Sequence, residues 1–258
     1  MKIILALFLL SFTLFGAAQP SISKYINTTQ QKLPVQDDSS DDLDNEFSNE
    51  EEIKRVDPFE HYNRQMTSIN DSIYIKVLIP VATNYAKVVP VDVREGISNV
   101  FSNLVFPIRF VNNILQLKFS NAVEETGRFI VNSTLGIFGF FDPAKNALKW
   151  EAHEEDFGQT LGFYGVGPGA HLVLPLLGPS NLRDMLSIIP DSVLNPTSEF
   201  FYDLPVDTSN GFVLNSIYFV NKASLHLGEY ESIKKDAIDL YPFMRDLYEQ
   251  NRISEIKE

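Results

Sequence analysis

Prolines divide this chain into short amphipathic stretches, and that division most limits what it can fold into. Proline removes a backbone donor and breaks helix interiors, so each stretch is expected to form its own short helix. Apolar residues at helical spacing predict helices over residues 60–74, 80–89, 93–104, 108–115 after the break at Pro107, 122–135, 182–189, 211–227 and 233–248. Strand signals are scarce, and HLVLPLL (171–177) is the best of them. The pattern therefore predicts a mainly α fold of short helices.

Charge and cysteine usage exclude several classes of function. The formal net charge is −13, whereas nucleic-acid binding and a simple electrostatic hold on anionic lipid both need clustered Lys and Arg. With no cysteine in the sequence, disulfides, thiolate zinc sites, iron–sulfur clusters and cysteine nucleophiles are excluded. No apolar run approaches the roughly 18 residues that a membrane-crossing helix needs.

The N-terminal part has two composition zones before the folded part. Lys2, an apolar core and the small residues Gly16 and Ala18 predict a secretory signal over 1–18, with a retained membrane anchor as the alternative. Residues 19–55 are polar and acidic, so we expect a flexible tether; calcium binding there lacks a Gly-centred loop with spaced oxygen ligands. The folded domain is expected over 56–258.

A glycine-rich window, EDFGQTLGFYGVGPG, raises the question of nucleotide binding. GVGPGA matches the G-x-G-x-x-A form of a dinucleotide loop at Gly165, Gly167 and Ala170. That motif must open a helix, and Pro168 and Pro175 leave room for about one turn only. Glycines that supply turns with positive φ, or that let backbone segments approach closely, account for the window better.

Catalytic and metal-binding patterns are weak. There is no G-x-S-x-G elbow, and Ser180 lacks the second glycine, so no nucleophile–base pair of a lipid hydrolase can be assembled. His153 followed by three acidic residues is the densest possible metal cluster, but adjacent loop residues rarely converge on one ion. We expect no enzyme activity, no cofactor and no metal.

Polar residues interrupt otherwise apolar helices at Asn112, Asn113, Arg128 and Asn132. A buried unpaired polar group costs roughly 1–3 kcal/mol, so two interpretations remain. They are hydrogen-bonded core residues that tie helices together, or they line a wet, partly polar passage.

From DPFEHYNR (57–64) to the end, the sequence resembles the MlaA (VacJ) family of outer-membrane lipid-asymmetry proteins. The blocks that carry the resemblance are VVPVDVREGISNVFSNLVFPIRFVNNILQ, GRFIVNSTLGIFGFFDPA, EDFGQTLGFYGVGPG, LPLLGPSNLRD and DLYPFMRDLYEQNR. They stand in the family's order and cover most of the chain beyond the tether.

The resemblance implies a ring of short amphipathic helices with a central amphipathic channel, lying in the inner leaflet of the outer membrane. Phospholipids that strayed into the outer leaflet would pass to the periplasmic carrier MlaC, and trimeric porins are implied as partners. The protein is then exported to the periplasmic face of the outer membrane. The family's lipidated N-terminal cysteine is missing, which keeps open the alternative of a porin-associated scaffold without lipid transfer.

Motif positions supply the candidate lipid-channel residues, namely Asp57, Pro58, Phe59, Asn63, Arg64, Asn112, Asn113, Arg128, Asn132, Phe157, Gly158, Gln159, Gly162, Tyr164, Gly165, Gly167, Arg183 and Asp184. The resemblance also predicts a turn-and-hairpin segment beside the channel at the glycine-rich window. Replacing Gly165 or Gly167 by Val is expected to impair lipid removal.

Overall fold

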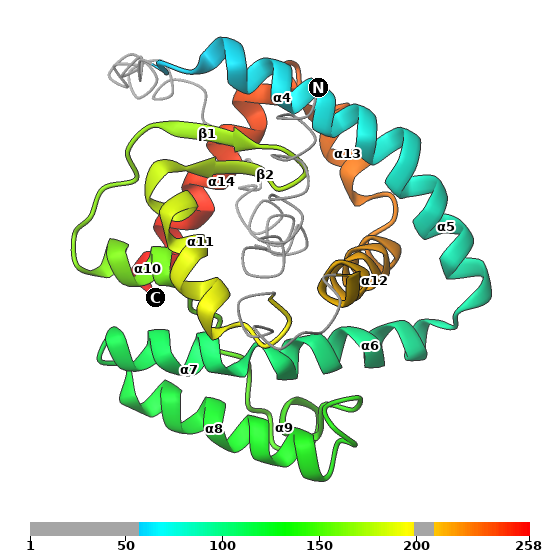
Figure 1. The fold of residues 1–258 in the computed structure, drawn as a ribbon, viewed down its shortest axis with the longest axis vertical. Helices are drawn as coiled ribbons and strands as arrows, with labels where there is room; N and C mark the ends of the chain where they lie inside the picture. Colours follow the sequence, from blue (N-terminus) through cyan, green and yellow to red (C-terminus); the bar gives the residue numbers. More distant parts are fainter. Residues whose placement is uncertain (1–56, 199–208) are drawn as a thin grey trace, which may run out of the picture.

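The elements follow one another around a ring in the computed structural model, which describes residues 57–198 and 209–258 (Figure 1). The predicted signal and tether (1–55) lie outside the described residues. In chain order the helices and strands are α4 (Glu60–Ile73), η1 (Tyr74–Leu78), α5 (Ile79–Val88), α6 (Val91–Leu104), α7 (Phe106–Leu115), α8 (Phe119–Thr134), α9 (Pro143–Asn146), α10 (Phe157–Phe163), β1 (His171–Leu174), β2 (Gly178–Asn181), α11 (Leu182–Leu194), α12 (Ser209–Leu225), α13 (Glu229–Asp236) and α14 (Leu240–Lys257).

The ring closes because elements distant in the sequence pack against each other. α8 lies antiparallel along the outside of α7, and α12 packs on α5 and α6 (Figure 1). α14, the last helix, packs on α4, α10 and β2. The mainly α prediction is confirmed, and the two described strands form one small antiparallel hairpin that pairs His171 with Asn181.

The sequence pattern predicts a helix break near Pro80, but the helix continues through that residue. α4, η1 and α5 form one continuous helix, and η1 is a π-helical turn in which the Ile79 N–H bonds to the Tyr74 carbonyl. The wider π turn absorbs the missing N–H of Pro80, so no break is required. α11 likewise continues through Pro190 to Leu194, beyond the predicted end at 189.

The predicted single helix over 233–248 is wrong. α13 ends at Asp236, Ala237 is extended, and Asp239 caps a new helix by accepting a hydrogen bond from the Tyr241 N–H. Pro242 explains the break, because proline is tolerated in the first turn of a helix but not inside it.

The glycine-rich window is only partly the turn-and-hairpin segment that the resemblance predicts. Its first half is α10, which Asp156 caps by accepting from the Gln159 N–H at 2.8 Å. The loop after Gly165 leads into β1 rather than a helix, so the dinucleotide-loop interpretation is wrong. Gly165 has φ +84°, which a valine side chain would strain, whereas Gly167 has open space around it and nothing in the structure requires glycine there.

Candidate functional site

Polar side chains dominate the interior of this protein. The largest fully buried side chains are Gln116, Glu125, Val173, Asn63, Asn112, Asn113, Asn195, Asn221, Asp191 and Ser192, of which only Val173 is apolar. In a water-soluble domain Asn, Gln, Asp and Glu are mostly exposed. In the described part of the chain, polar side chains are therefore buried where a water-soluble domain would bury apolar ones.

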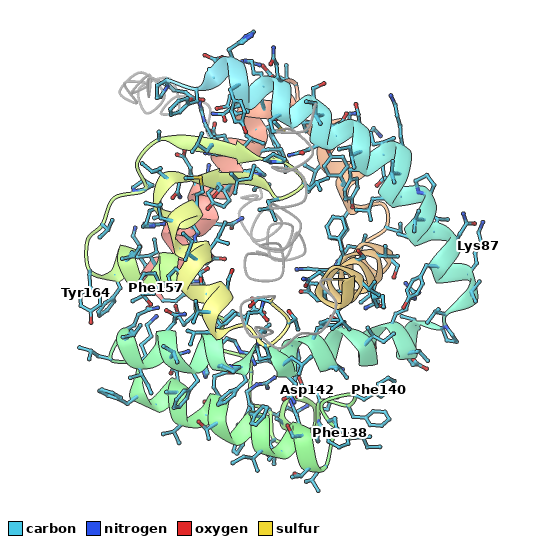
Figure 2. The ribbon with its side chains drawn as sticks, viewed as in Figure 1. Lys87, Phe138, Phe140, Asp142, Phe157 and Tyr164 are labelled. Atoms are coloured by element: carbon cyan, nitrogen blue, oxygen red, sulfur yellow. The ribbon has the colours of Figure 1, made fainter. Side chains whose placement is uncertain are left out.

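Large apolar side chains cover the outside. Val88, Leu135 and Phe138 are 82%, 74% and 80% exposed. Figure 2 shows Phe138 and Tyr164 pointing away from the ring at its outer edge. Exposed apolar surface on this scale marks an interaction site for membrane or protein.

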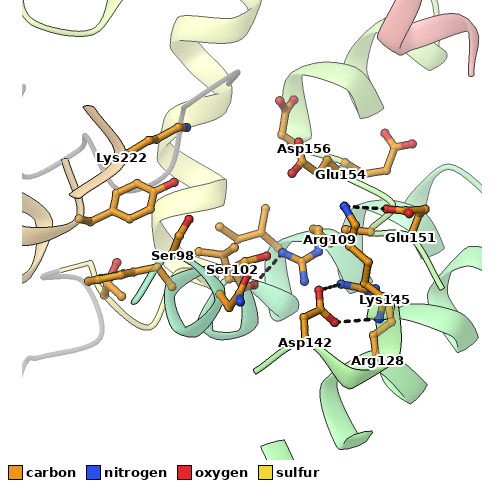
Figure 3. A pocket seen from close by; sticks show the side chains of 18 of the residues that line it. Ser98, Ser102, Arg109, Arg128, Asp142, Lys145, Glu151, Glu154, Asp156 and Lys222 are labelled. Carbon is orange, nitrogen blue, oxygen red and sulfur yellow. Dashed lines mark hydrogen bonds and ion pairs between the residues drawn. The ribbon is translucent and has the colours of Figure 1, made fainter. Parts of the chain in front are cut away.

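A polar cavity of about 490 Å³ lies where side chains of α6, α7 and α12 face those of α8, α9 and the segment before α10 (Figure 3). α6, α7 and α12 form one part of its wall, and the segment from Glu151 to Asp156 forms another. Charged side chains of both signs line it, namely Arg109, Arg128, Lys145, Lys222, Arg252, Asp142, Glu151, Glu154, Glu155, Asp156 and Glu255. A charged or zwitterionic group can therefore occupy the cavity without losing all polar partners.

Most cations in this wall are paired with carboxylates. The Arg109 Nε lies 2.6 Å from Glu125, and the Arg128 Nη2 lies 3.0 Å from Asp142. Lys145 Nζ lies 3.3 Å from Glu151 (Figure 3). The cavity wall is thus electrostatically balanced over most of its surface.

A second, smaller pocket of about 150 Å³ has the opposite character. It lies between α4, η1, the hairpin, α13 and α14, and its lining includes Ile73, Tyr74, Leu78, Val173, Leu176, Leu177, Phe219, Tyr230, Met244 and Leu247. The Tyr74 and Tyr230 rings pack with centroids 4.2 Å apart. One ring of helices thus holds a charged cavity and an apolar pocket.

Asn63 joins three elements that are far apart in the sequence. Its side chain is fully buried and donates to the His171 carbonyl at 3.0 Å and to the Tyr241 hydroxyl at 3.2 Å, while its oxygen accepts from the Val173 N–H. Asp57 accepts from both Asn63 and Tyr241. This joint connects α4, β1 and α14.

Asn112 is the centre of a second joint. It donates to Asp191 at 3.1 Å and accepts from the Thr160 hydroxyl at 2.8 Å, so it connects α7 with α10 and α11. Its neighbour Asn113 donates to the His153 carbonyl at 3.2 Å. Both side chains are fully buried, so they tie elements together and do not line either pocket.

Arg252 on α14 forms the third joint. It contacts Asp184 at 3.0 Å and Asp156 at 2.7 Å, and the Tyr248 hydroxyl donates to Asp184 at 2.6 Å. Burial alone would raise the pKa of Asp184. The positive charge of Arg252 and the hydrogen bonds donated to the Asp184 carboxylate hold that pKa below its ordinary value. Arg183 adds a further contact to Asp184 at 2.9 Å.

Two positions of the glycine-rich window lie against this third joint. A Cβ at Gly158 would meet Arg252 Nη2 at 2.6 Å, and one at Gly162 would meet Ile256 Cδ1 at 2.6 Å. Gly158 therefore leaves room for the buried contact between Arg252 and Asp184, whereas the end of the Ile256 side chain can move away from a Cβ at Gly162.

The α8–α9 junction is the fourth joint. Arg128 and Asn132 both donate to Asp142, at 3.0 Å and 2.8 Å, and Arg128 also donates to the Trp150 carbonyl. Asp142 in turn caps α9 by accepting from the Lys145 N–H. Its pKa is lowered by these hydrogen bonds and by Arg128, against the opposing effect of burial.

The structure places most of the motif residues in these joints and at the outer edge. Arg128 and Gln159 are the motif residues that line the polar cavity. Arg64 pairs with Asp239 at 2.6 Å on the surface, and Phe59 and Tyr164 are exposed.

Sequence reasoning missed four residues of the cavity wall, namely Ser98, Ser102, Tyr218 and Lys222. The available signal was their spacing, because Ser98 and Ser102 on α6, and Tyr218 and Lys222 on α12, are each four residues apart.

A family model described as "MlaA lipoprotein" matches residues 55–255 of this chain. The chain belongs to the MlaA family. An uncharacterised protein of Rickettsia typhi is 30% identical over 206 residues, 80% of each chain. The intermembrane phospholipid transport system lipoprotein MlaA of Haemophilus influenzae is 27% identical over 201 residues, 77% of this chain and 78% of that protein.

A solved structure agrees with this assignment. It comes from work described as the structural basis for maintenance of bacterial outer membrane lipid asymmetry. The superposition covers 78% of this chain and 100% of that chain, with a TM-score of 0.68 and 30% sequence identity. The MlaA-family fold is therefore shown for this chain.

Two kinds of feature are absent from the described residues. Neither 57–198 nor 209–258 contains a helix long and apolar enough to cross a membrane. Within the same residues no three His, Asp or Glu side chains gather as a metal site; His153 pairs with Glu124 at 3.2 Å instead.

Proposed function

We propose that this protein is a phospholipid conduit of the outer membrane, which takes mislocalised phospholipids from the outer leaflet and passes them toward a periplasmic carrier. The observation that carries the proposal is the reversed distribution of polarity, with a charged cavity between the helices and large apolar side chains exposed on the surface. Apolar side chains at the outer face suit contact with acyl chains in one leaflet.

Phospholipid chemistry matches the two internal spaces. A headgroup needs polar and charged partners when it leaves water, and the 490 Å³ cavity supplies them. An acyl tail needs apolar surroundings, and the pocket between Tyr74, Leu177 and Met244 offers them. Passage of this kind makes and breaks no covalent bond, which suits a role without catalysis.

Family membership supports the partners that the resemblance implies. The relatives named for intermembrane phospholipid transport suggest a place in the same system for this chain. On this proposal the protein lies at the periplasmic face of the outer membrane, delivers lipid to a soluble carrier of the MlaC type, and is held there together with trimeric porins. It acts without its own energy source, so downstream partners set the direction.

The test obstructs the cavity and leaves the outside unchanged. Ser102 lines the cavity from α6, so Ser102→Trp places a large indole ring in the cavity, whereas Ser120→Trp adds the same side chain at an exposed position on α8. Both are expressed in cells that lack an MlaA-family protein, and outer-leaflet phosphatidylethanolamine is measured by surface labelling of its amine. The native chain and Ser120→Trp are expected to remove the excess lipid, and Ser102→Trp is not.

A scaffold without lipid transfer gives a different result. Ser102→Trp, present at native level and folded by circular dichroism, would then restore asymmetry as well as Ser120→Trp does. Failure of the native chain itself to lower outer-leaflet phospholipid would contradict the conduit.

A further inference from the structure

One cation in the wall of the polar cavity has no carboxylate partner in the described part of the chain. The ion pairs of Arg109, Arg128 and Lys145 are made with Glu125, Asp142 and Glu151, and Arg252 contacts three carboxylates. Lys222 on α12 makes none, and in Figure 3 it lies on the opposite side of the cavity from Arg109, Arg128 and Lys145.

Neighbouring groups leave the Lys222 ammonium available to a ligand. Its Nζ lies 5.6 Å from the centroid of the Tyr218 ring, a cation–π contact that uses no hydrogen-bond donor. α12 packs against α6, where Ser98 and Ser102 also line the cavity, one helical turn apart. Figure 3 shows both hydroxyls on the wall between Lys222 and Arg109.

These three groups have the chemistry of an anion site. An ammonium carries three donors, and each serine hydroxyl carries one. Lysine binds phosphate as a point charge, and hydrogen bonds to charged groups are stronger than neutral ones. We propose that Lys222, with Ser98 and Ser102, binds the phosphodiester of a phospholipid headgroup as the lipid passes through the cavity.

The rest of the wall favours a phosphodiester over free phosphate. Six carboxylates line the cavity against five Lys and Arg side chains, so its wall keeps a slight negative charge. Phosphate with a free second ionisation carries a charge of about −1.5 to −2 at pH 7, so this wall repels it more than it repels a monoanion. A lipid phosphodiester carries one negative charge, and a headgroup amine gains from the same carboxylates. This inference rests on the proposed function and names the headgroup contact within it.

The experiment combines two lipids with two forms of residue 222. Phosphatidylethanolamine and diacylglycerol share their acyl chains, and only the first has a phosphate. Each is offered in detergent micelles to purified full-length chain, and bound lipid is counted by native mass spectrometry. The native chain is expected to prefer phosphatidylethanolamine by about tenfold, the value of one charge-assisted hydrogen bond. In Lys222→Gln the preference is expected to fall below about twofold.

Matched variants separate a local site from the general charge of the protein. Lys87→Gln removes one positive charge at an exposed position on α5, outside the cavity lining. It is expected to keep the native preference, and Lys222→Arg is expected to keep most of it because the charge is retained. Inorganic phosphate, added as a competitor, is expected to displace no lipid.

Each other outcome overturns the proposal in a distinct way. Equal preference in the native chain and a folded Lys222→Gln shows that Lys222 does not bind the phosphate, while lipid binding and the proposed function stand. Equal loss in Lys87→Gln shows that the total charge of the protein, not a local site, sets the lipid preference. Displacement by inorganic phosphate that depends on Lys222 marks a free-phosphate site. A native chain that binds neither lipid contradicts the proposed function as well.

Discussion

Asp191 is the buried carboxylate whose protonation matters most at the residue scale. Its oxygens accept from the Phe157 N–H and from Asn112, each at 3.1 Å, and its side chain is nearly fully buried. Burial, together with the neighbouring charge of Asp156, raises the pKa of Asp191 to about 8. The joint between α7, α10 and α11 therefore holds a proton near neutral pH.

Protonation of Asp191 makes the protein less stable as the pH rises. The native state binds a proton at Asp191 between the ordinary pKa of about 3.9 and the raised value, so the free energy of unfolding falls as pH rises through that window. Asp191→Asn removes the titration and keeps an oxygen acceptor. The quantity to compare is the melting temperature of Asp191→Asn minus that of the native chain, measured by scanning calorimetry. We expect this difference to be larger at pH 8 than at pH 5.

Asp246→Asn is the control for this comparison, because Asp246 is half exposed and pairs with its neighbour Arg245 on the surface. Its difference from the native chain is expected to change little between the two pH values. An Asp191→Asn difference that is also constant would show that Asp191 does not titrate between them.

At the scale of elements, the turn between α8 and α9 gathers several exposed apolar side chains in one short segment. Leu135, Ile137, Phe138 and Phe141 are all largely exposed, and Phe138 points away from the ring (Figure 2). Ile137 and Phe138 both have positive φ, 54° and 56°, which is unusual for bulky residues. The joint at Asp142 holds this turn in place.

If the ring lies in one leaflet, this turn enters the bilayer. Burying a Phe side chain contributes roughly 1.5–3 kcal/mol, so Phe138→Ser is expected to lower partitioning into phosphatidylethanolamine–phosphatidylglycerol vesicles about tenfold in a flotation assay. Ile238→Ser is the control, because Ile238 is fully exposed in the connection between α13 and α14. That connection lies across the ring from the turn (Figure 1). Equal partitioning of the two variants would place the turn outside the bilayer.

At the scale of the whole molecule, α14 closes the ring through Arg252. This one guanidinium, which is almost fully buried, contacts Asp156, Asp184 and Glu255. Burial opposes its charge, but the nearby Asp156 and Asp184 carboxylates hold the pKa of Arg252 well above its ordinary value. Removal of one member of a buried ion pair leaves its partners uncompensated.

Arg252→Met is therefore expected to lower the free energy of unfolding by about 3–5 kcal/mol in urea titrations. Arg245→Met on the same helix is the matched control, since its pair with Asp246 is partly exposed and contributes about 0–1 kcal/mol. Similar losses in both variants would mean that the buried cluster does not hold the ring closed.

Local patterns in the sequence determined the mainly α class, the positions of most helices and the family. Helical periodicity and helix termination depend on residues a few positions apart, so they can be read directly from the chain. The sequence predicted the wrong helix ends at Pro80, at Pro190 and before Pro242. At each of these positions a proline can either end a helix or be accommodated in it. Tertiary contacts and the π turn decide between a break and a continued helix.

Only the tertiary structure decided what each polar residue does. Asn112, Asn113 and Asn132 tie elements together, and Arg128 both ties elements and lines the cavity. Lys222 lines the cavity without a carboxylate partner among residues 57–198 and 209–258. Whether a buried charge is compensated depends on partners such as Arg252 and Asp156, which are far apart in the sequence. Composition and periodicity carry no information about such pairs, because compensation is a property of distances between side chains in the folded ring.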